Sequence, residues 1–200
     1  MIRKSLILFL GALIGIYAVL PHLGRRVPEF LVYVLIAAIA TAVGTYLLPR
    51  TQLKVGSAMR DAGLAAGIGI VTAVVLVVLG RLLIGSQSPS PPIWTGVLYA
   101  FYGGLTEEVV FHFGLLTAVA WLALKIAPET VRAYWSAIAI SAIAVGLSHS
   151  TTTDASILTA IGAYVTGWLY WRRGLEAAMI AHGGIGFALH VWAPGVFVVA

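Results

Sequence analysis

Residues 93–124 read IWTGVLYAFYGGLTEEVVFHFGLLTAVAWLAL, and this apolar stretch is the most informative part of the chain. A helix needs about 20 mostly apolar residues to cross a bilayer, so the stretch is too long for one straight crossing. We expect it to be tilted, bent near Gly103 and Gly104, or continued outside the lipid. Its charged side chains before Lys125 are Glu107 and Glu108. A carboxylate near the bilayer centre costs roughly 2.5–3.5 kcal/mol, so both are expected to face a bundle interior or a wet cavity and to have a function.

The rest of the chain has the same apolar character. Of its 200 residues, 60% are hydrophobic and only 10% are charged, whereas a soluble domain carries about 25% charged residues. Because lipid offers no water to unpaired backbone groups, long apolar segments cross it as helices. The segments of this kind are Ser5–Leu20, Phe30–Leu48, Ala62–Ile84, Ile93–Leu124, Ala133–His149, Ala155–Trp171 and Leu175–Trp192. The sequence therefore predicts an all-α polytopic membrane bundle of about seven transmembrane helices, in a single domain covering residues 1–200.

The basic residues predict an orientation for these spans. The first segment resembles a signal peptide, but no small-x-small cleavage site follows it, so we expect it to be retained. With the N-terminus inside, all Lys and Arg residues except Arg25, Arg26 and Arg81 fall inside, which agrees with the positive-inside rule. Their short groups between apolar segments also exclude a nucleic-acid partner, despite a net charge of +5. We therefore expect an integral membrane protein, in contact with the lipid bilayer, with a cytoplasmic N-terminus.

Acidic and basic side chains inside the later segments carry the functional signal. The fourth segment holds Glu107, Glu108 and His112, the fifth ends at His149, and the seventh contains His182. Residues four apart on a helix share a face, so His112 could hold Glu108 while Glu107 lines a cavity. A glutamate beside a histidine can deprotonate a water that attacks an amide carbonyl, and a second histidine can stabilise the oxyanion. The chain has no cysteine, which excludes disulfides, thiol nucleophiles and thiolate metal sites.

Three separated motifs carry these residues. They read Glu107-Glu108-Val-Val-Phe-His112, Val145-Gly-Leu-Ser-His149 and His182-Gly-Gly-Ile-Gly186. They resemble the motifs of intramembrane glutamic endopeptidases of the CAAX-protease and bacteriocin-processing (CPBP, or Abi) type, which are Glu-Glu-x-x-x-Arg, Phe-x-x-x-His, and His-x-x-x-Asn or a similar polar residue. The resemblance covers Trp94 to Trp192. Residues 93–200 are therefore expected to hold the catalytic core spans, and residues 1–92 the N-terminal spans without motifs.

The resemblance implies a role for each matching residue. Glu107 would activate water together with His149, Glu108 would be the supporting partner of Glu107, and His182 would lie on the oxyanion side. It also implies an intramembrane endopeptidase that acts on a peptide or membrane-protein substrate, resides in a prokaryotic cell membrane and requires no cofactor. The substrate itself is not indicated by the sequence.

Three positions depart from the family pattern. His112 stands in place of the arginine, Val145 in place of the phenylalanine, and Gly186 in place of the polar residue. Because histidine can be neutral, His112 would support the glutamates less firmly than arginine, and Gly186 offers no donor to an oxyanion. A catalytically inactive relative that acts as a membrane adaptor or immunity protein is therefore a second hypothesis.

Two further functions use the same residue types. Glu108 and His112, at helical spacing, could bind zinc together with His149 and His182; we rank this second because adjacent glutamates are not a zinc signature. A small proton-coupled carrier would also place Glu and His side chains inside the membrane. A carrier predicts inverted repeats and broken helices, and the sequence shows neither.

Purely structural interpretations also exist for single residues. If the fourth segment breaks near Gly103 and Gly104, then Glu107 and Glu108 become first-turn residues that the helix dipole stabilises. His190, near the end of the seventh segment, is interpreted as an interfacial residue.

Overall fold

The computed structural model describes residues 2–19, 27–56, 58–84, 92–127, 130–149 and 152–192. These residues form helices and contain no strand, which confirms the all-α prediction. The α-helices are α1 (Ile2–Val19), α2 (Val27–Leu47), α3 (Ala58–Leu83), α4 (Ile93–Phe101), α5 (Thr117–Ile126), α6 (Thr130–His149), α7 (Thr153–Arg173) and α8 (Leu175–Phe187). A short 3₁₀ helix, η2 (Leu48–Arg50), follows α2, and two π-helices are present, η3 (Tyr102–Leu116) and η4 (Ala188–Trp192).

The helices agree with the predicted spans. Five helical stretches are long and apolar enough to cross a membrane: Ile2–Val19, Pro28–Arg50, Arg60–Leu83, Ile93–Ile126 and Val131–His149. The stretch Leu175–Val191 is a shorter apolar helix. α7 has 21 residues but intersperses threonine, glycine and tyrosine among its apolar residues. Each predicted segment falls within one helical stretch, apart from Ile84, which follows the end of α3, and Leu20, which lies outside the described residues. The helices begin up to four residues before the predicted segments and end up to two residues after them.

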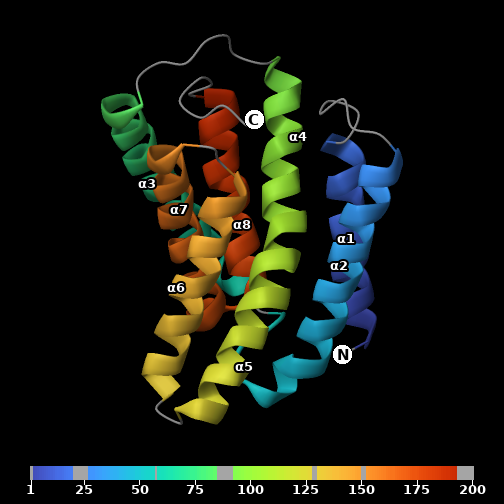
Figure 1. Cartoon of the computed structure of the whole chain (residues 1–200). Coiled ribbons are helices and arrows are strands. Elements are labelled where there is room, and N and C mark those ends of the chain that lie inside the picture. Colours follow the sequence, from blue (N-terminus) through green and yellow to red (C-terminus); the bar gives the residue numbers. More distant parts are fainter. Residues whose placement is uncertain are drawn as a thin grey trace.

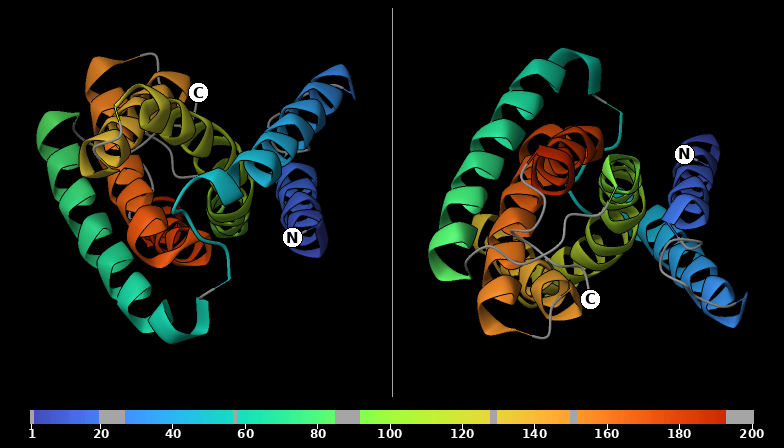
Figure 2. Two further views of the ribbon diagram at one scale, coloured as in Figure 1. Left: turned by 90° about the horizontal axis from the view of Figure 1, so that it is seen from below. Right: turned by 90° about the horizontal axis from the view of Figure 1, so that it is seen from above.

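One long helical rod organises the bundle. α4, η3 and α5 follow one another without a break and run through its middle (Figure 1). In both end views, the α1–α2 pair stands on one side of this rod, while α3, α6, α7 and α8 group on the other (Figure 2). α1, α2 and α8 all pack against η3, α3 covers α8, and α6 pairs with α7. The central part of the rod is therefore enclosed by helices from both sides.

The π-helix η3 occupies this enclosed part. It begins at Tyr102, where the sequence predicted an irregularity near Gly103 and Gly104. The backbone does not break there, so Glu107 and Glu108 lie inside the rod and not in the first turn of a new helix. The first-turn interpretation of the two glutamates is therefore wrong. Long π-helical stretches are rare and are frequently found at functional sites.

Small residues allow the neighbouring helices to approach η3 closely. Thr106 donates a hydrogen bond of 2.9 Å from Oγ1 to the carbonyl oxygen of Ala12 in α1. On the other side, a Cβ atom at Gly104 would lie 3.2 Å from Cα of Gly183 in α8. Glycine at position 104 therefore allows the close approach of η3 and α8.

Candidate active site

Glu107 and His149 form the most exposed pair of the site. Glu107 lies in η3 and His149 ends α6, and 2.7 Å separate Oε1 of Glu107 from Nε2 of His149. On the other side of the ring, Nδ1 is 2.8 Å from the carbonyl oxygen of Val145 and 3.0 Å from Oγ of Ser148. A carbonyl oxygen only accepts, so Nδ1 carries a hydrogen. The 2.7 Å contact on the other side of the ring then holds one proton, which lies either on Nε2 of His149 or on Oε1 of Glu107.

Glu108 is fully buried and contacts two histidines. Nδ1 of His182 lies 2.8 Å from Oε1 of Glu108, and Nδ1 of His112 lies 3.0 Å from Oε2. The contact with His112 is not aligned as a hydrogen bond, and neither atom has a hydrogen-bond partner among the described residues. Nε2 of His112 is 3.2 Å from the carbonyl oxygen of Ala163 in α7. The His112 ring therefore lies beside the Glu108 carboxylate and is held in place from α7.

Carboxylates and imidazoles alternate across three helical elements, η3, α6 and α8. A distance of 3.5 Å between Nε2 of His182 and Oε2 of Glu107 joins the two pairs described above. Neighbouring residues of an α-helix project about 100° apart. A π-helix has more residues per turn, so the angle between neighbours is smaller. This geometry lets Glu107 and Glu108 reach the same imidazole of His182.

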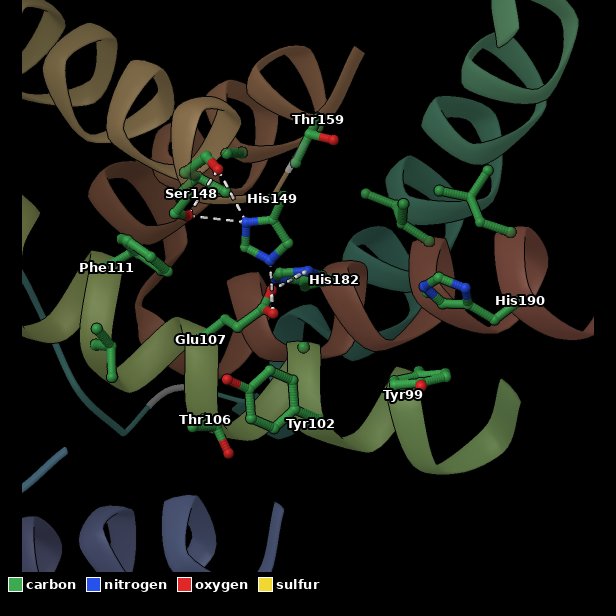
Figure 3. A pocket seen from close by; sticks show the side chains of 18 of the residues that line it. Tyr99, Tyr102, Thr106, Glu107, Phe111, Ser148, His149, Thr159, His182 and His190 are labelled. Atoms are coloured by element: carbon green, nitrogen blue, oxygen red, sulfur yellow. Dashed lines mark hydrogen bonds and ion pairs between the residues drawn. The ribbon is translucent and has the colours of Figure 1, made fainter. Parts of the chain in front are cut away.

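A cavity of about 390 Å³ opens beside this chain of polar groups. Glu107, His149 and His182 line it, with side chains 12%, 25% and 20% exposed, whereas Glu108 and His112 are buried behind them. Figure 3 shows Glu107 reaching from the rod toward His149 and His182. Apolar side chains from both halves of the chain complete the walls: Val19, Tyr33, Ile36, Leu76, Val145, Leu158 and Ile185. A bound molecule would thus touch three of the predicted site residues directly.

Glycine residues leave room for the imidazoles. A Cβ atom at Gly103 would lie 2.9 Å from Nε2 of His182 and 3.6 Å from Oε2 of Glu107. A Cβ atom at Gly167 in α7 would lie 3.2 Å from Nε2 of His112. Any side chain at Gly103 would therefore displace the groups that face the cavity.

Comparison with known proteins identifies the family of this chain. A family model described as type II CAAX prenyl endopeptidase Rce1-like matches residues 89–188, which are half of the chain. The chain belongs to this family. No curated protein and no solved structure matched it. The CAAX-protease resemblance carried by the motifs is thereby confirmed, and together with the apolar helices it makes the protein an integral membrane protein of a CAAX-type protease family.

The Rce1-like match covers the rod and the helices that complete the polar site. It extends from before α4 to the end of α8, and so includes Glu107, Glu108, His149 and His182. α1, α2 and α3 lie outside the matched residues, yet each contributes an apolar side chain to the cavity wall. The N-terminal spans without motifs therefore help to enclose the site of this Rce1-like protein.

The departures from the family motifs lie in contact with the site. Val145 and Gly186 both line the cavity, and His112 contacts Glu108. A Cβ atom at Gly186 would lie 3.0 Å from Cα of Ala100, so a larger residue there would require α4 to move. The close packing of α4 on α8 accounts for glycine at this position of the Rce1-like chain.

One residue at the cavity was not predicted from the sequence. His190 lines the cavity together with Glu107, which its interpretation as an interfacial residue did not include. Its ring packs against Tyr99 with 5.4 Å between the ring centroids. The signal that could have revealed it is spacing, because His182, Gly186 and His190 follow one another at intervals of four residues.

The side chains considered as zinc ligands are engaged as carboxylate–imidazole pairs. Among the described residues, no three His, Cys, Asp or Glu side chains converge as metal ligands would. Nδ1 of His112 and Nδ1 of His182 each face a different oxygen of Glu108, and Nε2 of His149 faces Glu107. Zinc remains an alternative that metal analysis of the purified protein would decide.

Proposed function

We propose that this Rce1-like protein is an intramembrane endopeptidase in which Glu107 and His149 activate a water molecule. The observation that carries the proposal is the 2.7 Å contact between Oε1 of Glu107 and Nε2 of His149 at the wall of a cavity. That cavity lies within an apolar bundle, where a carboxylate and an imidazole are expected to have a task. Together they supply a base and an acid for hydrolysis.

The proposed reaction begins with a water bound beside the Glu107–His149 pair. Glu107 takes a proton from the water as its oxygen attacks the carbonyl carbon of the peptide bond. The π electrons of the carbonyl move onto oxygen, which becomes an oxyanion. When the C–N bond breaks, the proton is delivered from the pair to the leaving amine, and a new carboxylic acid and a new amine result. No covalent bond to the protein forms, and the chain has no cysteine to form one.

His182 is proposed to face the oxyanion, with Glu108 and His112 supporting it. Its Nδ1 lies 2.8 Å from Glu108, which fixes the orientation of the ring. An imidazole that donates from Nδ1 to a carboxylate can stabilise an oxyanion through Nε2 only while Nε2 also carries a hydrogen. Glu108, held by His112, favours that doubly protonated form of His182. Glu108 and His112 are therefore positioning residues that do not touch the substrate.

The substrate is proposed to be a peptide or membrane protein that reaches the cavity from the bilayer or its surface. The apolar walls and the family both support this class of substrate. We further propose that the protein resides in a prokaryotic cell membrane with its N-terminus in the cytoplasm, and that it needs no metal or other cofactor.

A proteomic comparison tests the proposal. Membranes from cells that express the wild-type protein are compared with membranes from cells that express Glu107→Gln, and new peptide termini are identified by mass spectrometry. We expect a set of termini that depends on Glu107. Identical termini in both samples, at equal expression, would contradict the proposal. Proton flux through proteoliposomes of the wild-type protein would then favour a carrier, and absence of flux an adaptor.

A further inference from the structure

α7 holds His112 at two points, although none of the predicted site residues lies in this helix. Nε2 of the His112 ring is 3.2 Å from the carbonyl oxygen of Ala163. The backbone carbonyl of His112 accepts a hydrogen bond of 3.2 Å from Oγ1 of Thr117, and that oxygen lies 3.0 Å from the hydroxyl of Tyr170. His112, Thr117 and Tyr170 are all buried. α7 therefore holds the ring of His112 directly and its backbone through Thr117.

The two hydroxyl contacts have a definite direction. A threonine hydroxyl has a single hydrogen, and the carbonyl oxygen of His112 can only accept, so Thr117 donates to His112. Oγ1 of Thr117 must then accept from the hydroxyl of Tyr170. This hydroxyl relay runs from Tyr170 through Thr117 to the carbonyl of His112. It lies where the π-helix η3 ends, because the backbone N–H of Thr117 also donates to the carbonyl oxygen of His112.

The face of α7 that carries the relay fits the His112 ring. Ala163, Gly167 and Tyr170 are spaced four and three residues apart and therefore share this face. A Cβ atom at Gly167 would lie 3.2 Å from Nε2 of His112, so glycine leaves room for the imidazole there. Glu108 does not fix the ring by itself, because the 3.0 Å contact of its Oε2 with Nδ1 of His112 is not aligned as a hydrogen bond. The position of the ring beside Glu108 therefore depends on α7.

We propose that Tyr170 is a positioning residue of the active site, which acts through Thr117 on His112 and Glu108. Without the Tyr170 hydroxyl, the Thr117 hydroxyl loses the donor that fixes its direction, and the carbonyl of His112 loses a steady donor in turn. His112 can then move away from Glu108, whose other oxygen lies 2.8 Å from Nδ1 of His182. Tyr170 is buried away from the cavity wall and therefore does not touch the substrate. The proposal rests on the proposed endopeptidase function, since its effect on the reaction passes through His182.

Removal of single hydroxyl groups tests this role. The rate of cleavage is measured in liposomes with an internally quenched peptide that spans a Glu107-dependent cleavage site from the proteomic comparison. Because a lost hydrogen bond corresponds to roughly tenfold in rate, Tyr170→Phe should lower kcat about tenfold and leave KM unchanged. Thr117→Val should have the same effect, and the double variant little more than either alone. Thr117→Ser, which keeps the hydroxyl, should retain the wild-type kcat.

Tyr134→Phe is the matched control. Tyr134 is also fully buried, and its hydroxyl accepts a hydrogen bond of 2.7 Å from the backbone N–H of Gln52, outside the relay. This variant should therefore lower the free energy of unfolding about as much as Tyr170→Phe does, and leave kcat unchanged. An equal loss of kcat in both variants would show a general effect of stability and would overturn the proposal. A wild-type kcat in Tyr170→Phe would overturn it as well.

Histidine resonances separate this proposal from the proposed function, because they need no substrate. The protein is labelled with ¹⁵N-histidine, and the imidazole resonances are assigned by replacing one histidine at a time. Tyr170→Phe should shift the resonances of His112 and His182, and Tyr134→Phe should leave them in place. An unmoved His112 resonance in Tyr170→Phe overturns the positioning role and leaves the endopeptidase function standing. If no Glu107-dependent cleavage is found, the endopeptidase function fails, while shifts at His112 and His182 in Tyr170→Phe alone still support the role of Tyr170.

Discussion

Replacing His112 by leucine should destabilise the protein because it leaves the buried carboxylate of Glu108 with one partner fewer. Glu108 is fully buried, and Oε2 has Nδ1 of His112 at 3.0 Å as its close polar neighbour. Breaking a buried ion pair by removing one partner costs about 3–5 kcal/mol. Since His182 still lies 2.8 Å from Oε1, we expect His112→Leu to lower the free energy of unfolding by about 3 kcal/mol, the lower end of that range.

A double-mutant cycle shows whether the loss comes from the charge. Glu108→Gln keeps an acceptor for His182 but removes the charge, so His112→Leu should cost less than about 1 kcal/mol in that background, and the coupling should be about 2 kcal/mol. Unfolding is followed by circular dichroism as sodium dodecyl sulfate is added to the protein in mild detergent. An equal cost in both backgrounds would show that His112 contributes packing alone, and would refute the electrostatic role.

Further predictions concern the same site and the orientation of the chain. His112→Arg should keep or raise cleavage activity, because arginine supplies a permanent positive charge beside Glu108; complete loss, with bound metal in the wild-type protein, would instead make His112 a metal ligand. Gly103→Ala should lower activity at least tenfold, since the new Cβ would lie 2.9 Å from Nε2 of His182, whereas Gly184→Ala, with open space around its Cβ, should leave activity unchanged. Because the chain has no cysteine, a single introduced cysteine reports the side of the membrane on which it lies. With a cytoplasmic N-terminus, a membrane-impermeant thiol reagent should label Lys54→Cys only from the cytoplasmic side and Ser88→Cys only from the opposite side. The reverse pattern would show the opposite orientation.

The sequence predicted the helices well because their signal is local. Each span is a run of apolar residues whose length is set by the bilayer, and its bounds can be counted along the chain. The pairing of Glu108 with His112 was also accessible, because four residues of helix place two side chains on one face. Their 3.0 Å contact agrees with that expectation.

The convergence of the site was beyond the sequence pattern. The predicted spans put His149 at one end of its segment and His182 away from the ends of its own. They therefore do not predict that the two side chains lie at the same depth in the membrane. In the structure, α6 ends and α7 begins lower than the start of α4 in the view of Figure 1, so His149 reaches Glu107. The π-helix at Tyr102–Leu116 leaves no mark in the apolar pattern either. Both depend on how the helices pack against each other, and for the same reason the sequence did not place His190 at the cavity.

The role of Glu107 as the general base is tested by the rate at which Glu107→Gln cleaves a peptide, compared with the wild-type protein in the same liposomes. General base catalysis contributes about 10²–10⁴-fold, so we predict a loss of at least about a hundredfold with unchanged helix content. His149→Ala should lose a comparable factor, and the double variant little more than either alone, because residues that act as a unit are not additive. Cleavage by Glu107→Gln at the wild-type rate would show that Glu107 is not the general base.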